Sequence, residues 1–232
     1  MSEREKILDR IREALKQPSL LPGAHAPLHE GPAHPPTPRA AATGAREWLP
    51  AVGPSPEEQL NTFKACALDL KADFHVLDGP EALPAFLQNL AAVEGWKKVG
   101  IHSGPLTDLA AAALGLPLVY TRRGYDVNEL ESCDVGVTEC DALVAQTGSV
   151  LVTERSAGGR ALSVLPPHHL VLARLDQMVP DLPAAFALIK EKYQANYPSF
   201  ISFITGPSRT GDIERILVLG AHGPKKLTII CV

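Results

Sequence analysis

Short β-type runs alternate with helix-type runs from residue 56 onward, and this alternation constrains the fold of the chain more than any other feature. Apolar residues at helical spacing predict helices over residues 55–72, 79–93, 104–115 and 181–194. Short apolar runs between them, over residues 73–78, 97–102, 116–121 and 166–173, predict strands. We therefore expect an α/β fold, with one mixed, mainly parallel sheet from residue 74 onward and helices on both faces.

The middle of the chain departs from this alternation. Residues 134–154 hold three β-like runs with almost no room for a helix between them. "ALVAQ" and "SVLVT" are separated by Thr147 and Gly148, which suits a tight turn or hairpin. We expect these two runs and the preceding "DVGVT" to be neighbours in the sheet. The last 30 residues indicate strand, polar loop, strand, turn and strand.

The N-terminal quarter has a different character. Residues 3–16 carry apolar side chains on one helical face and charged side chains on the other. The stretch from residue 17 to 56 holds ten of the 21 prolines, which remove backbone donors and fix φ. The sequence thus predicts three parts: a helix over 1–16, an irregular proline-rich linker over 17–55, and an α/β domain over 56–232.

Composition excludes several classes of protein. A net charge of −4 and an aromatic content of 5% argue against nucleic-acid binding. No apolar run reaches the roughly 18 residues of a membrane span. The chain is charged from its third residue, Glu3, unlike a secretory signal, so we expect a cytoplasmic protein. The four cysteines are scattered without a CxxC pair, so we expect neither a metal site nor a cofactor in this chain.

The Thr147-Gly148-Ser149 turn is the first candidate for chemistry. It would expose backbone N–H groups and two hydroxyls that suit a carboxylate or phosphate. The alternative is a hairpin turn that merely requires glycine. Just before it, Glu139 and Asp141 are two residues apart and share a face on a strand. They form either an acid/base pair or the exposed side of that strand.

The second candidate lies in "SAGGRALSVLPPHHLVLA". The glycine pair permits close backbone approach, and Arg160 suits a bidentate contact with a carboxylate. His168 and His169 open a strand, where successive side chains point to opposite faces. One histidine is therefore expected inward and the other near solvent. A structural role is the alternative for both.

The third candidate is "TGPSRTGDIE", followed by the turn "GAHG". This stretch is rich in glycine, hydroxyl and charged residues beyond what a turn requires, although a surface meander is the alternative. Strand-end loops of an open α/β sheet converge on one crevice, so we expect a single site for a small anionic ligand. The residues expected to contribute to it are Thr147, Gly148, Ser149, Arg160, His168, Thr205, Gly206, Ser208, Arg209, Asp212 and His222.

Three stretches together, "GVTECDALVAQTGS", "SAGGRALSVLPPHHLVLA" and "TGPSRTGDIERILVLGAHGPKKLTIICV", resemble the signature blocks of the lactate-utilisation (LUD) domain family. The resemblance covers about residues 56–232. It implies a three-layer α/β fold like the NagB/RpiA/CoA-transferase group. It also implies a role beside an Fe–S subunit and a second cysteine-rich subunit in oxidising L-lactate to pyruvate.

The chain departs from the family pattern at one position. Gln146 stands where the family often has a glutamate, and an amide cannot form an acyl-enzyme intermediate. The chain also has no cysteine cluster that would ligate Fe–S clusters, which are therefore expected in partner subunits. The leading hypothesis is an accessory subunit of an L-lactate oxidation system. The alternatives are a stand-alone enzyme handling acyl groups or phospho-sugars, and a scaffold without a small-molecule site.

Overall fold

The computed structural model describes residues 3–14, 16, 49–121, 125–210, 218–220 and 222–232. The chain divides into two units, Met1–Arg46 and Glu47–Val232. The first unit contains helix α1 (Glu3–Ala14), as the amphipathic pattern predicts. Ile7 and Ile11 on this helix are exposed. Most of the expected linker falls on residues 17–48, outside the described residues, so its irregular conformation stays a prediction.

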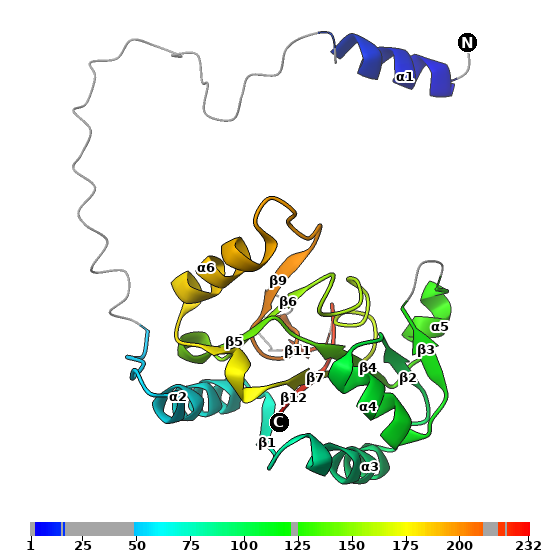
Figure 1. Ribbon diagram of the computed structural model, residues 1–232. Coiled ribbons are helices and arrows are strands. Elements are labelled where there is room, and N and C mark those ends of the chain that lie inside the picture. Colours follow the sequence, from blue (N-terminus) through cyan, green and yellow to red (C-terminus); the bar gives the residue numbers. More distant parts are fainter. Residues whose placement is uncertain (1–2, 15, 17–48, 122–124, 211–217, 221) are drawn as a thin grey trace, which may run out of the picture. The chain divides into compact units, whose positions relative to one another are not determined.

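A six-stranded sheet forms the centre of the second unit (Figure 1). Its strand order is β1-β12-β7-β4-β2-β3, and every pair of neighbours is parallel. The strands are β1 (Asp73–Val76), β2 (Val99–Ile101), β3 (Leu118–Tyr120), β4 (Val135–Glu139), β7 (His168–Ala173) and β12 (Lys226–Cys231). This arrangement confirms the predicted α/β class and the mainly parallel sheet.

The first helix of this unit begins at a local capping signal. Helix α2 (Pro56–Asp69) starts with a capping box in which the Ser55 hydroxyl accepts from the Glu58 N–H and the Glu58 carboxylate accepts from the Ser55 N–H. The other helices are α3 (Leu83–Glu94), α4 (Pro105–Leu114), α5 (Val127–Glu131) and α6 (Leu182–Tyr193), with 3₁₀ turns η2 (Pro80–Ala82), η3 (Ala145–Thr147) and η4 (Leu175–Gln177). Helices α3 and α4 share one apolar cluster with one face of the sheet.

A second sheet packs on the opposite face. Its order is β8-β5-β6-β9, formed by β8 (Met178–Val179), β5 (Ala142–Val144), β6 (Ser149–Thr153) and β9 (Ile201–Ile204). The expected β5–β6 hairpin is present, and β6 also pairs antiparallel with β9. Residues of β5 and β6 share an apolar cluster with α2, β7 and β12. Other residues of the same strands pack against α6.

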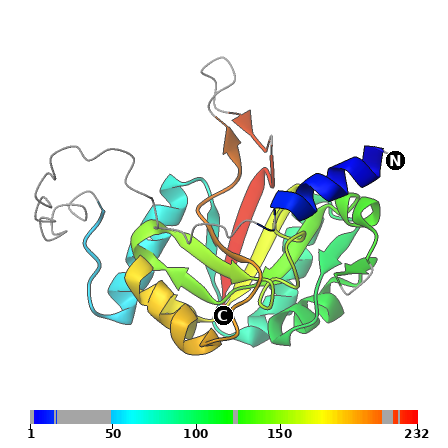
Figure 2. The ribbon, with the colours of Figure 1, turned by 90° about the horizontal axis from the view of Figure 1, so that it is seen from above.

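The expectation of one continuous sheet is therefore wrong. "DVGVT" lies in the six-stranded sheet as β4, whereas "ALVAQ" and "SVLVT" contribute β5 and β6 to the four-stranded sheet. Side chains of β5 and β6 are buried on both faces, so these strands need cover on two sides. Packing between the large sheet and α6 supplies that cover. A short ribbon, β10 (Arg209–Thr210) with β11 (Val218–Leu219), extends from the body (Figure 2).

Candidate functional site

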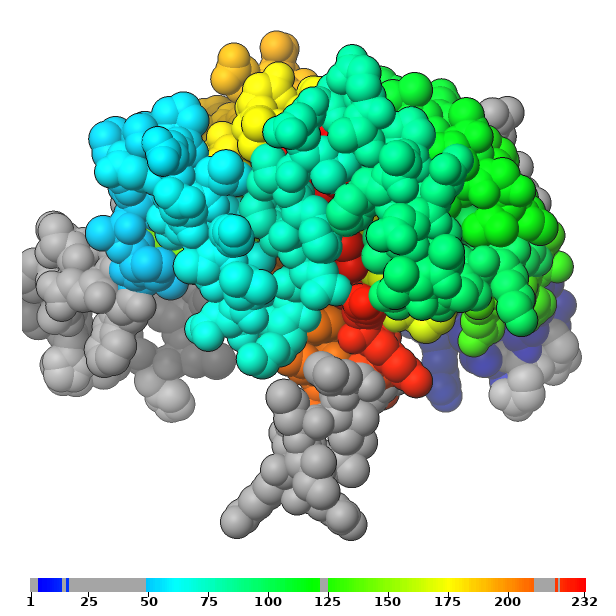
Figure 3. Space-filling view, turned by 90° about the horizontal axis from the view of Figure 1, so that it is seen from below, coloured from blue at the N-terminus to red at the C-terminus, as the bar shows by residue number. Residues whose placement is uncertain are grey.

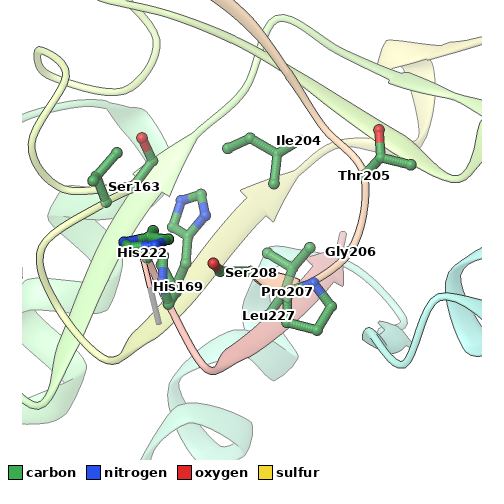
Figure 4. A pocket seen from close by; sticks show the side chains of 12 residues that line it. Ser163, His169, Ile204, Thr205, Gly206, Pro207, Ser208, His222 and Leu227 are labelled. Carbon is green, nitrogen blue, oxygen red and sulfur yellow. The ribbon is translucent and has the colours of Figure 1, made fainter. Parts of the chain in front are cut away.

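A pocket of about 250 Å³ lies where β7 and β12 begin, and we call it the amino-edge pocket. Figure 4 shows it with the side chains of Ser163, His169, His222 and Ser208 on one side and Thr205 on the other. The lining residues are Ser163, Val164, His169, Ile204, Thr205, Gly206, Pro207, Ser208, His222, Gly223, Pro224 and Leu227. The predicted residues Thr205, Gly206, Ser208 and His222 are therefore brought together.

His169 is the buried polar group of this pocket. Its side chain is 1% exposed, and its Nε2 lies 2.9 Å from the Thr138 hydroxyl. Its Nδ1 is buried and has no hydrogen-bond partner among the described residues. Burial, and secondarily the neighbouring His168, lower the pKa of His169 to about 3, so the imidazole is neutral near pH 7. A buried nitrogen without a partner is costly, and a bound ligand would satisfy it.

The loop after β9 is held against the turn before β12. The Ser208 N–H donates to the Pro224 carbonyl at 2.9 Å, and the Gly220 N–H donates to the Ser208 carbonyl at 2.9 Å. These two segments, orange and red, emerge side by side in Figure 3. Gly206 has a φ of +80°, and a Cβ there would lie 2.9 Å from the Leu70 carbonyl oxygen. Glycine thus lets the loop pass close to the end of α2.

The two loops predicted to approach each other do meet. The Ser149 hydroxyl lies 2.7 Å from the Thr147 hydroxyl and 2.8 Å from the Thr205 hydroxyl. Thr205 borders the amino-edge pocket, while Thr147 lines a neighbouring hollow with Cys66. Gly148, with φ +61°, packs closely on α2. The hydroxyl chain therefore reaches the pocket only at Thr205.

Arg209 does not line the pocket itself, but it contacts Thr205, which does. Its side chain is exposed and its Nη2 donates to the Thr205 carbonyl at 3.2 Å. The guanidinium also lies over Gly206, 3.1 Å from where a Cβ would be. A guanidinium has five N–H donors, and this contact uses one of them. Asp212, which is also expected at the site, lies outside the described residues.

Two further predicted residues, Arg160 and His168, also lie outside this pocket. Arg160 donates through Nη2 to the Ser199 carbonyl at 2.8 Å, away from the amino-edge pocket. His168 points to the other face of the sheet, where its Nε2 lies 2.9 Å from the Thr228 hydroxyl and its ring packs edge-on against Trp96. Burial lowers the pKa of His168 to about 4. Both histidines are buried, so the expectation that one lies near solvent is wrong.

The sequence did not identify His169 as the pocket residue, because the alternation of side chains along a strand predicts only that the two histidines face opposite ways. Leu170 and Leu172 share the His168 face and pack with α3 and α4, whereas Val171 and Ala173 share the His169 face. Which of these faces carries the pocket depends on the second sheet. Ser163 was missed as well, since nothing near it in the sequence distinguishes it from an ordinary loop serine.

Glu139 and Asp141 are not an exposed acidic pair. Glu139 ends β4, and its Oε1 accepts from the Leu106 and Thr107 N–H groups at 2.8 and 3.1 Å, at the start of α4. Asp141 is 3% exposed, and the chain has already left β4 at that point. The two carboxylates therefore have separate partners, because the strand on which they would share a face ends between them.

Gln146 has a structural contact where the family often has glutamate. Its Nε2 donates to the Pro50 carbonyl at 3.1 Å and its backbone N–H donates to the Pro180 carbonyl at 3.0 Å.

In the described part of the chain, no three His, Cys, Asp or Glu side chains are placed to hold a metal ion. Burial raises the pKa of the Cys140 and Cys231 thiols, which favours the protonated form. Across the residues that the structure describes, no helix has the length and apolar character of a membrane span.

The fold and the pocket define an α/β protein with an open parallel sheet, backed by a smaller sheet, and a pocket of polar and apolar residues at the sheet edge. The chain belongs to the LUD domain family, whose model matches residues 70–232. A solved structure, a DUF162 family protein from Deinococcus radiodurans, has the same fold, with a TM-score of 0.58 and 23% identity. The match covers 77% of this chain and 98% of that one.

Curated relatives carry the name Lactate utilization protein C. The one from Geobacillus thermodenitrificans (strain NG80-2) is 36% identical over 201 residues, covering 81% of this chain and 84% of the relative. The one from Anoxybacillus flavithermus (strain DSM 21510 / WK1) is 38% identical over 112 residues, covering 48% of this chain and 50% of the relative. The chain thus spans about half the length of this second relative. It likewise covers 45% of the relative from Geobacillus sp. (strain WCH70).

Proposed function

We propose that this protein is an accessory component of an L-lactate oxidation system in the cytoplasm, and that the amino-edge pocket binds lactate or a similar small hydroxy acid. The names of the curated relatives, Lactate utilization protein C, support the lactate role. Oxidation of lactate to pyruvate releases two electrons and two protons. In this proposal Fe–S clusters of partner subunits accept the electrons, because the four cysteines of this chain are dispersed.

The unsatisfied Nδ1 of His169 is the observation that carries the ligand assignment. The Thr138 hydroxyl is able to donate to Nε2 or accept from it, so Nδ1 is available in either role. A neutral imidazole nitrogen suits the hydroxyl of a hydroxy acid as a hydrogen-bond partner. Ser208 lines the same pocket, and in this proposal the Arg209 guanidinium, which contacts the lining residue Thr205, holds the carboxylate.

Two measurements test this function separately. A host deleted for its own copy is complemented with wild type, Arg209→Ala or Arg160→Ala and grown on L-lactate. Wild type and Arg160→Ala should restore growth, since Arg160 lies outside the pocket. Arg209→Ala should weaken it. Growth of the deletion strain at the wild-type rate would exclude the lactate role.

Calorimetric titration of the purified chain with L-lactate and with pyruvate tests the pocket. Arg209→Ala should lose about 1.5–3 kcal/mol of a charge-assisted contact, or roughly ten- to a hundred-fold in affinity. Arg160→Ala is the matched control, since it removes another exposed arginine. If growth depends on the protein but neither acid binds, the pocket assignment is wrong and the lactate role remains.

A further inference from the structure

A second pocket, of about 430 Å³, lies at the opposite edge of the large sheet, and we call it the carboxyl-edge pocket. Glu139 at the end of β4 and Arg174 directly after β7 line it, together with Arg155 after β6 and Lys192 on α6. Ligands of open α/β sheets bind outside the carboxyl ends of the strands. The amino-edge pocket is at the other end, so these are two separate sites.

A buried carboxylate organises the carboxyl-edge pocket. Asp141 Oδ1 accepts from the Lys192 ammonium at 2.6 Å and from the Tyr193 hydroxyl at 2.5 Å. Its Oδ2 accepts from the Ser156 hydroxyl at 2.6 Å. Burial raises the pKa of Asp141, but these hydrogen bonds outweigh it and hold the pKa below its usual value. Asp141 is thus ionised and fully engaged, and it fixes the Lys192 side chain beside the pocket.

The two arginines of this pocket, Arg155 and Arg174, are not held by strong ion pairs among the described residues. The Arg155 guanidinium lies over the Tyr193 ring at 5.1 Å, and its Nη2 donates to the Asn196 carbonyl at 3.1 Å. Arg155 forms no ion pair within the residues described here. In the described part of the chain, Arg174 forms an ion pair only with the exposed Asp176, at 3.3 Å, and such surface pairs contribute little.

The other carboxylate of this pocket, that of Glu139, also has hydrogen-bond partners. Glu139 caps the first turn of α4 through the Leu106 and Thr107 N–H groups, where the helix dipole favours negative charge. The pocket therefore presents three cationic side chains from three different elements, and both carboxylates that line it already have partners. Three cationic side chains against two carboxylates give the lining a net positive charge, which favours an anion.

We propose that the carboxyl-edge pocket binds the phosphate group of a phosphorylated small molecule, held by Arg155, Arg174 and Lys192. The planar guanidinium fork matches phosphate oxygens in two parallel hydrogen bonds, and the ammonium adds a point charge. Tyr193 stacks beneath Arg155 and donates to Asp141, so one side chain positions two of the three cations indirectly. This site is independent of the proposed lactate pocket.

Calorimetric titration of the full chain with inorganic pyrophosphate, at about 0.15 M salt to screen non-specific attraction, tests the proposal. Arg155→Ala and Arg174→Ala should each weaken binding about tenfold or more, since each removes a charge-assisted contact. Lys190→Ala is the control, because it removes a positive charge from the same helix outside the pocket. Thermal unfolding confirms that each variant is folded.

The outcomes separate the alternatives. No detectable binding at millimolar pyrophosphate would overturn the proposal. Equal weakening by Lys190→Ala would overturn it too, because that result means general charge attraction. Loss of binding in Arg209→Ala, with Arg155→Ala unaffected, would move the anion to the amino-edge pocket. Where Arg174→Ala fails to fold, Arg174→Gln supplies the same test.

Discussion

The hydroxyl of Ser149 lies 2.8 Å from the hydroxyl of Thr205, although 56 residues separate the two in the sequence. The contact joins the β5–β6 turn to the loop that follows β9. Ser149 is 2% exposed, so its hydroxyl is removed from water and depends on protein partners. Thr147 completes the chain of three hydroxyls. The position of the loop at the amino-edge pocket therefore depends in part on the hairpin.

A double-mutant cycle measures this contact. Ser149→Ala and Thr205→Val should show a coupling free energy of about 0.5–1.5 kcal/mol in urea unfolding, the usual range for a neutral hydrogen bond. Additive effects of the two substitutions would mean that the hydroxyls contribute independently. Ser202→Ala with Ser149→Ala is a suitable control pair, because Ser202 pairs with Val152 rather than with the turn.

Gly148→Ala should destabilise the protein by more than about 2 kcal/mol. The left-handed φ of +61° costs roughly 1–2 kcal/mol for a residue with a Cβ. The added Cβ would also lie 2.9 Å from the Ala67 backbone nitrogen on α2. Gly115→Ala is the matched control, since its φ is +59° and a Cβ there meets nothing within 4 Å. Equal losses in the two variants would contradict the close packing of the turn on α2.

Acid should destabilise the protein through its two buried histidines. The folded-state pKa values of His168 and His169 are lowered to about 4 and about 3, from an ordinary value of 6.5. Above pH 6.5 neither state binds the proton. Between pH 6.5 and about 4 the unfolded state binds protons that the folded state does not, so stability falls as pH falls.

The expected loss from this pair of histidines is about 2–4 kcal/mol between roughly pH 7 and 5. Urea unfolding at the two pH values measures it. His169→Asn removes one of the two titrating groups, so it should reduce the pH-dependent part by about half, whatever its effect on stability at neutral pH. An unchanged pH dependence in that variant would show that His169 titrates normally.

Tyr193→Phe should lower the free energy of unfolding by about 1–3 kcal/mol, because it removes a hydrogen bond to an ionised, buried acceptor. The substitution removes the 2.5 Å contact with Asp141 and the 3.0 Å contact with the Thr153 hydroxyl. Tyr197→Phe provides the control, as that tyrosine is 51% exposed. Matching losses in both variants, by thermal or urea unfolding, would show that the Asp141 contact contributes little stability.

Local features of the sequence determined the individual elements. The Ser55 and Glu58 capping box fixed the start of α2, because both partners lie within one turn of the chain. Thr147 and Gly148 fixed the β5–β6 hairpin in the same way, through the left-handed conformation that glycine adopts. The alternation of strands and helices determined the α/β class. Successive side chains of a strand point to opposite faces, and this alternation determined that His168 and His169 face opposite ways.

Only the tertiary structure decided how these elements combine. The placement of β5 in a second sheet follows from burial on both of its faces, and that burial depends on residues far away in the sequence. The same packing selects His169 rather than His168 for the amino-edge pocket and sends Arg160 elsewhere. It also buries Asp141 against Lys192 and Tyr193, 51 and 52 residues later. Side-chain spacing sets local direction, whereas long-range packing sets which side chains meet.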